Sequence, residues 1–290
     1  MIMETIVKLN KFNDLYIIDN ADSYLLSNRK FSYRFDESFC INKTRKVKTY
    51  CKQNGKKVYM LVNKIFKDHE LDDLKVFLEK LKKVDIDGIF FTDFAVFMIA
   101  KELNIEDKCI FYHETFLRNS YDIVTYQEMG IKKIICSKDM HIDDINNLPT
   151  NRKDDYGIIC FGYIPLYESQ RKIISNYVEL NKLPAKTKSS KTLALKENTR
   201  DTLYKVIEQE GVSSIFNDEV LSYIEYMEKL SKHINMFIFD SFFFDSAYIK
   251  NVIDLFKEAV DGKNNVEKLQ KLNENIKFTD GFINKRIGLM

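Results

Sequence analysis

The sequence carries no strong net charge and no long apolar run. Its 45 Lys and Arg residues nearly balance 43 Asp and Glu residues, which leaves a formal net charge of +2 at pH 7. This balance gives no strong attraction to nucleic acid or to an anionic membrane, so any RNA contact would need a local basic patch. The most apolar run, from Ile89 to Ala100, is interrupted by Asp93 and is much shorter than the roughly 20 residues that span a bilayer. We therefore expect no membrane partner.

The spacing of the cysteines excludes the common disulfide and metal motifs. No CxxC pair occurs. The cysteines are odd in number and lie mostly within apolar runs: Cys40, Cys51, Cys109, Cys136 and Cys160. This pattern indicates reduced, buried thiols and a reducing compartment. Glu4, Lys8 and Lys11 interrupt any apolar core of a signal peptide at the start of the chain. The sequence therefore predicts a cytoplasmic protein.

Short apolar runs alternate with longer amphipathic segments, which is the pattern of parallel strands joined by crossover helices. The predicted strands are Thr5 to Leu9, Ser23 to Leu26, Lys57 to Asn63, Gly88 to Thr92, Lys108 to His113, Lys133 to Ser137, Tyr156 to Gly162 and Met236 to Asp240. Eight such strands predict an α/β fold, a TIM-like (β/α)8 barrel. The spacing of Leu71, Leu74, Phe77, Leu78 and Leu81 predicts an amphipathic helix with Asp68 as its N-cap.

The alternation fails between about residues 176 and 217, where a turn-rich spacer separates two alternating segments, 192–196 and 202–209. This predicts a β-hairpin excursion between the seventh and eighth strands. Helical periodicity returns at 219–230 and at 248–260. We expect one barrel domain over residues 1–262, followed by a polar C-terminal extension, 263–290, in which a short helix leads into a loose tail.

Function in such a barrel belongs to the carboxyl ends of the strands, where the loops converge. Polar side chains that end or follow the predicted strands are therefore the candidate site residues. They are Asn63, Asp93, His113, Asn119, Lys138, Asp139, Arg171 and Asp240. This placement alone gives no reaction type.

Several segments, taken in order, resemble the collagenase-like peptidase U32 family. NADSYLLSNRKFSYR, from Asn20 to Arg34, resembles the family's opening strand and loop, in which Phe and Arg follow the strand. KKVYMLVN and DGIFFTD are similar to the next strands, which end in Asn63 and Asp93. The segment around YQEMGIKKIICSKD and the closing segment, from Asp240 to Val260, also match in family order. The resemblance implies a barrel related to the TIM fold.

The segment FGYIPLYESQR, from Phe161 to Arg171, is similar to the family signature but lacks its metal ligands. Many members carry four cysteines that bind an iron–sulfur cluster, and the resemblance places Pro165 and Lys172 at the first two ligand positions. No cysteine follows Cys160. Cluster iron is held by thiolates, so we expect no iron–sulfur cofactor and no metal site in this chain. The family's closing strand also continues into Gly and Arg, where this chain has Ser241 and Phe242.

The resemblance implies a peptidase or hydrolase with a small barrel-mouth pocket for a small molecule or a peptide. His113 or Asp139 would act as the acid or base, and Arg171 would hold an anionic group. The plainer interpretations are that His113 is a partly exposed loop residue and that Lys138 and Asp139 are ordinary surface charges. No GxSxG motif occurs, and His69 with Glu70 lacks the second His of a zinc protease.

Two other functions stay open at this point. A non-catalytic accessory subunit, bound to a partner protein or to a second copy, fits the loss of site residues, because some relatives act in pairs. RNA modification by hydroxylation is the third hypothesis. Basic stretches at Lys43 to Lys48 and at Lys186 to Lys191 could contact phosphate, although solvated surface is their usual role.

Overall fold

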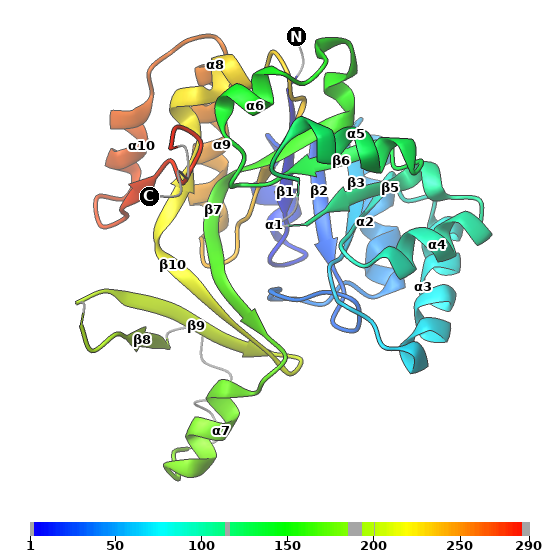
Figure 1. Cartoon of the computed structure of the whole chain (residues 1–290), viewed down its shortest axis with the longest axis horizontal. Helices are drawn as coiled ribbons and strands as arrows, with labels where there is room; N and C mark the ends of the chain where they lie inside the picture. The colour runs from blue at the N-terminus through cyan, green and yellow to red at the C-terminus, as the bar shows by residue number, and fades with distance from the viewer. Residues whose placement is uncertain (1–2, 114–116, 185–192, 200, 286–290) are drawn as a thin grey trace.

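The computed structural model describes residues 3–113, 117–184, 193–199 and 201–285, and its centre is a closed ring of eight parallel strands (Figure 1). The strands of the ring are β1 (Glu4–Lys8), β2 (Ser23–Ser27), β3 (Lys57–Val62), β4 (Gly88–Phe91), β5 (Cys109–Tyr112), β6 (Lys133–Cys136), β7 (Tyr156–Ser169) and β11 (Met236–Phe239). β11 pairs in parallel with both β1 and β7, which closes the ring. The predicted (β/α)8 barrel and its eight strands are confirmed.

Helices cover the outside of the ring. They are α1 (Asp14–Ile17), α2 (Ile41–Gln53), α3 (Leu71–Val84), α4 (Phe94–Glu102), α5 (Ser120–Glu128), α6 (Ile142–Asn146) and α9 (Ser246–Val260), with 3-10 turns η1 (Asp68–Glu70), η2 (Glu106–Lys108) and η3 (Thr150–Asp155). Leu74, Phe77 and Leu78 of α3 are buried, as their spacing predicts. The predicted N-cap was wrong: Asp68 begins η1, and Glu70 precedes α3.

One segment leaves the barrel, and we call residues 163–222 the arm. β7 continues past the ring and pairs antiparallel with β10 (Val212–Ser222), which pairs with β9 (Leu203–Gln209) and then β8 (Ala194–Lys196). In Figure 1 the arm extends below the barrel, with α7 (Ile173–Leu180) at its far end. The predicted excursion exists, but it is wider than 176–217 because it uses the second half of β7.

The helix predicted from residue 219 was wrong in its first part, because β10 runs to Ser222 before η5 (Ile224–Tyr226) and α8 (Met227–Leu230). Pairing with β7 overrides the local helical pattern there. The loose tail was also wrong for the described residues. After α10 (Val266–Leu272), β12 (Phe278–Thr279) pairs with β10, and Ile283 is fully buried. No helix in the described ranges has the length and apolar character needed to cross a bilayer.

Side chains inside the ring form layers, because every second residue of a strand points to the same side. At the amino-terminal end of the strands, the Glu4 carboxylate accepts hydrogen bonds from Ser23 Oγ and the Tyr59 hydroxyl, both at 2.6 Å, and from Lys57 Nζ at 2.8 Å. Apolar side chains such as Ile6 and Leu25 fill the middle of the barrel. The last inward positions are polar, namely Lys8, Ser27, Asn63, Thr92 and Asp240, and they lie at the barrel mouth.

Candidate functional site

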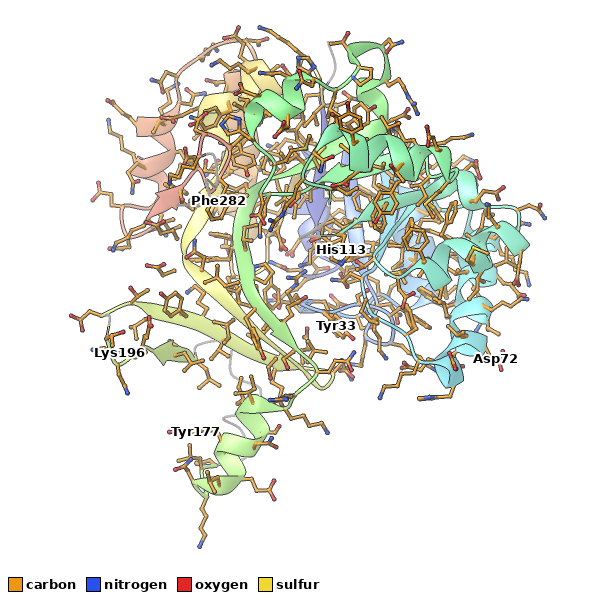
Figure 2. All side chains as sticks on the ribbon, viewed as in Figure 1. Tyr33, Asp72, His113, Tyr177, Lys196 and Phe282 are labelled. Carbon is orange, nitrogen blue, oxygen red and sulfur yellow. The ribbon has the colours of Figure 1, made fainter. Side chains whose placement is uncertain are left out.

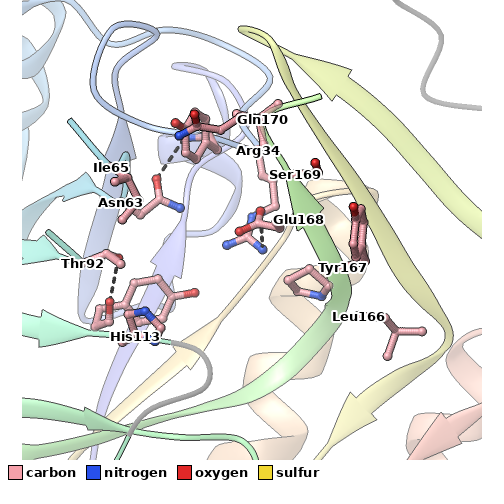
Figure 3. Close-up of a pocket in the computed structure, with 14 residues that line it drawn as sticks. Arg34, Asn63, Ile65, Thr92, His113, Leu166, Tyr167, Glu168, Ser169 and Gln170 are labelled. Atoms are coloured by element: carbon pink, nitrogen blue, oxygen red, sulfur yellow. Dashed lines mark hydrogen bonds and ion pairs between the residues drawn. The ribbon is translucent and has the colours of Figure 1, made fainter. Parts of the chain in front are cut away.

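A cavity of about 340 Å³ lies at the barrel mouth, between the ends of the strands and the arm (Figure 3). The loops after β2, β3, β4 and β5 form one wall, and residues 165–170 of the arm form the other. Figure 2 shows Tyr33 and His113 at this junction, far from Tyr177 and Lys196 at the outer part of the arm. The polar and aromatic side chains that line the cavity are Tyr33, Arg34, Asn63, Thr92, Tyr112, His113, Tyr167, Glu168 and Gln170.

Arg34 is the buried cation of this cavity. Its side chain is 4% exposed, and its Nη1 lies 3.3 Å from Oε1 of Glu168 on the arm. The backbone of Arg34 has a φ of 60°, a left-handed conformation that costs a non-glycine residue on the order of 1 kcal/mol. The neighbouring contacts hold this conformation, because Phe35 N donates to Gln209 Oε1 at 3.0 Å and Gln209 Nε2 donates to Phe35 O at 2.6 Å. The arm thus fixes the loop that carries Arg34.

The polar top layer of the barrel fixes the other wall. Asn63 Oδ1 accepts a hydrogen bond of 2.9 Å from the backbone N–H of Tyr33, and Thr92 Oγ1 donates to the carbonyl of Tyr112 at 2.7 Å (Figure 3). Burial, followed by the negative charge of Glu168, raises the pKa of Tyr33 to about 12. The Tyr33 phenol is therefore neutral at physiological pH and keeps a proton to donate.

The cavity brings together two of the predicted site residues, Asn63 and His113. Two others begin helices: Asp93 Oδ1 accepts from Ala95 N at 2.9 Å to cap α4, and Asn119 Oδ1 accepts from Asp122 N at 3.0 Å to cap α5. Neither lines the cavity. A structural role at a helix start accounts for both residues.

The remaining predicted residues also lie outside the cavity lining. Asp139 forms ion pairs with Arg118 at 3.0 Å and Lys138 at 3.2 Å beside the end of β6. Arg171 is exposed on the arm. Asp240 pairs with buried Lys8 at 3.0 Å.

Gly162 is explained by its approach to Asp240. A Cβ at this position would lie 2.8 Å from Asp240 Cβ and 2.9 Å from its carbonyl oxygen, and the φ of Gly162 is +143°. A side chain there would push β7 away from β11 at the point where β7 leaves the ring. The glycine of the signature segment therefore lets β7 pass close to Asp240 as it leaves the ring.

Sequence reasoning missed the residues that the arm brings to the mouth, above all Arg34, Tyr33 and Glu168. A signal existed, because Arg34 ends the opening segment of the resemblance and Glu168 lies within FGYIPLYESQR. Strand-end position alone could not select them, because Arg34 lies seven positions after Ser27, the last residue of β2, and Glu168 lies on the arm.

Comparison with known proteins identifies the family. The sequence model of peptidase family U32 matches residues 9–286 of this chain. The chain belongs to this family. The tRNA hydroxylation protein P2 of Bacillus subtilis (strain 168) is 25% identical over 246 residues, which cover 83% of this chain and 79% of that protein. The structure of the U32 peptidase Mk0906 has a TM-score of 0.51 at 11% identity, over 83% of this chain and 93% of that chain, and this likeness supports the fold.

The residues of this chain do not fit the iron–sulfur cluster that many U32 members bind. Pro165 stands in β7 opposite Phe216, and Lys172 is an exposed ammonium, so neither position offers a thiolate. Burial raises the pKa of the Cys160 thiol well above its ordinary value, and its Sγ donates to Ile238 O at 3.4 Å. Within the described ranges, no three His, Cys, Asp or Glu side chains gather as a metal-binding group.

Proposed function

We propose that this U32 protein takes part in tRNA hydroxylation by binding tRNA and admitting one unstacked nucleotide to the mouth cavity. The observation that carries this proposal is the set of side chains around Arg34. A buried guanidinium lies with the rings of Tyr33 and Tyr112 in one cavity, and Asn63 and Gln170 add amides. Proteins recognise unstacked bases by stacking on aromatic rings or guanidinium planes and by hydrogen bonds to the base edges.

The size of the cavity and its hydrogen-bond donors support a single nucleotide. Its volume of about 340 Å³ lies at the small end of the range for small-molecule pockets. The Arg34 guanidinium, although paired with Glu168, supplies N–H donors, and the neutral Tyr33 phenol supplies a further donor. The relative that covers most of this chain is named for tRNA hydroxylation, which supports RNA as the macromolecule. The proposal assigns binding to this chain and leaves the oxidising group to the complete reaction system.

Peptide hydrolysis, the activity in the family's description, is the competing function. It would need His113 to activate a water molecule or a hydroxyl group beside the bound peptide. Thr92, a nearby hydroxyl, already donates its proton to the carbonyl of Tyr112. The ring-lined shape favours a base over an extended peptide backbone, so we place RNA binding first.

The test compares tRNA nucleosides from cells with and without the gene for this chain. We expect a hydroxylated nucleoside to disappear on deletion, to return with the wild-type gene and to return only in part with Arg34→Gly. Mass spectrometry of digested tRNA measures it. Full hydroxylation in the deletion strain, together with cleavage of a peptide pool by the purified protein that His113→Gln abolishes, would overturn the proposal in favour of hydrolysis.

A further inference from the structure

The charge of this chain is unevenly distributed, although its sum is close to zero. Residues 38–67 contain no Asp or Glu and nine Lys or Arg residues. Five of these cations lie on α2, which is a helix of 13 residues with no acidic side chain: Lys43, Arg45, Lys46, Lys48 and Lys52. The other predicted basic stretch, Lys186 to Lys191, lies outside the described residues. The α2 segment therefore concentrates positive charge on one part of the barrel.

Neighbouring groups neutralise only part of this charge. Lys43 pairs with Glu37, and Lys48 pairs with Asp87 at 2.7 Å. Arg45, Lys46 and Lys52 are exposed, and in the described part of the chain no carboxylate lies within ion-pair distance of them. Arg45 Nη1 donates to the neutral Asn42 Oδ1, at 3.2 Å. We call the exposed side of α2 with these three cations the α2 face.

Other helices of the ring differ in charge. α3 mixes both signs, with Asp72 and Asp73 in its first turn and Lys82 and Lys83 in its last. α5 and α6 carry acidic residues and no Lys or Arg within their bounds. α6 connects β6 to β7, and in the strand order this connection lies across the ring from α2, between β2 and β3. An anionic partner would therefore be attracted to one side of the barrel and repelled from the other.

The position of the α2 face connects it to the mouth cavity. β2 ends at the mouth, and β3 begins at the opposite end of the barrel, so α2 runs along the outside from the mouth to the opposite end. Its first residue, Ile41, follows the loop that carries Tyr33 and Arg34. At about 1.5 Å per residue the helix is about 20 Å long, which is enough for several successive phosphates.

We infer that the α2 face is the surface on which the tRNA backbone lies when one nucleotide occupies the mouth cavity. This inference rests on the proposed function and adds the location of the phosphate contacts. Lysine and arginine side chains on a helix contact phosphates without selecting bases, so the α2 face positions the RNA and the cavity selects the nucleotide. Phosphate contacts of this kind release counterions and weaken as salt rises.

The test uses the triple variant Arg45→Gln, Lys46→Gln, Lys52→Gln. Its matched control is Lys229→Gln, Lys271→Gln, Lys277→Gln, which removes three exposed charges on the side of α8 and α10. Fluorescence anisotropy with total bacterial tRNA, at salt concentrations from about 50 to about 200 mM, measures affinity and its salt dependence. We expect the α2 variant to bind roughly tenfold more weakly at low salt and to lose about two to three units of the logarithmic salt slope, whereas the control matches the wild type.

The possible results separate the two proposals. If wild-type protein does not bind tRNA, both the proposed function and this inference fail. If the wild-type protein binds tRNA, and the α2 variant has an unchanged urea midpoint and binds tRNA as the control does, the inference about the α2 face fails and the proposed function stands. The inference would also be overturned if the wild-type protein bound polyglutamate as tightly as tRNA and the α2 variant lost the same affinity for both, because the face would then accept any polyanion.

Discussion

The two ends of the barrel both carry buried polar groups, but these groups are arranged for different purposes. At the amino-terminal end, three donors converge on the Glu4 carboxylate and close the barrel with a satisfied cluster. At the mouth, Arg34 and the surrounding tyrosines line an open cavity, and the arm holds them. The difference teaches that polarity alone does not mark a site. The cluster at one end stabilises the fold, and the cavity at the other can receive a ligand.

The largest expected effect is on stability at the amino-terminal end. Glu4→Ala leaves Ser23 and Tyr59 without their common acceptor, so we expect the free energy of unfolding to fall by about 3 kcal/mol. Urea denaturation measures it, and tRNA affinity of the folded variant should equal that of the wild type. Glu4→Gln, which keeps an acceptor oxygen, should lose less. A loss of tRNA binding without a loss of stability would break the comparison.

The second effect is a difference in alkaline behaviour. The pKa of Tyr33 is about 12 in the fold and about 10 when exposed. The protonated phenol therefore contributes fully to the free energy of unfolding below pH 10, and this contribution is lost as pH rises toward 12. Two pKa units correspond to at most about 2.7 kcal/mol. The pKa of Tyr59 is also raised, by burial and then by Glu4. We expect Tyr33→Phe to make the decline of unfolding free energy with pH shallower, and an unchanged decline would show that the Tyr33 phenol is already solvated.

The third effect is on binding at the mouth. Arg34→Gly removes the guanidinium and also the backbone strain at a φ of 60°, so stability should change by only about 1 kcal/mol. We expect tRNA affinity to fall roughly tenfold, which corresponds to about 1.4 kcal/mol. The control is Arg29→Gly. Arg29 is an exposed arginine of the same loop, and its Nε lies 3.1 Å from Oε1 of Glu210. Equal losses in the two variants would remove the special role of Arg34.

The smallest effect concerns the helix starts at the mouth. Asp93→Ala removes the N-cap of α4 and should lower the free energy of unfolding by about 1 kcal/mol. Thermal denaturation measures this change, and tRNA affinity should be unaffected. Should affinity fall more than stability, Asp93 would belong to the site after all.

The barrel could be predicted from the sequence because each of its strands and helices shows its own pattern within a short segment. Each ring strand is a short apolar run, and α3 shows its buried stripe in the spacing of Leu74, Phe77 and Leu78. The arm was recognised as an excursion, but its extent depends on pairing between β7 and β10, which are distant in sequence. Residues 219–222 therefore became strand, although their local pattern favours a helix.

The site was less accessible to sequence reasoning for a physical reason. Asn63 and His113 follow strands directly, so their position at strand ends selected them, and both line the cavity. Asp93 and Asn119 satisfy the same rule, but their side chains cap helices. Arg34 and Glu168 meet only because a left-handed loop and a strand that leaves the barrel approach each other. No local pattern encodes that contact.

Ultraviolet cross-linking of tRNA to the wild-type protein, followed by mass spectrometry of the peptides, tests the central claim most directly. If the mouth receives a nucleotide, the cross-linked peptides will contain Tyr33 or Tyr112, and Arg34→Gly will reduce these cross-links. Cross-links confined to the other end of the barrel, in the peptide with Lys57 and Tyr59, would contradict the account.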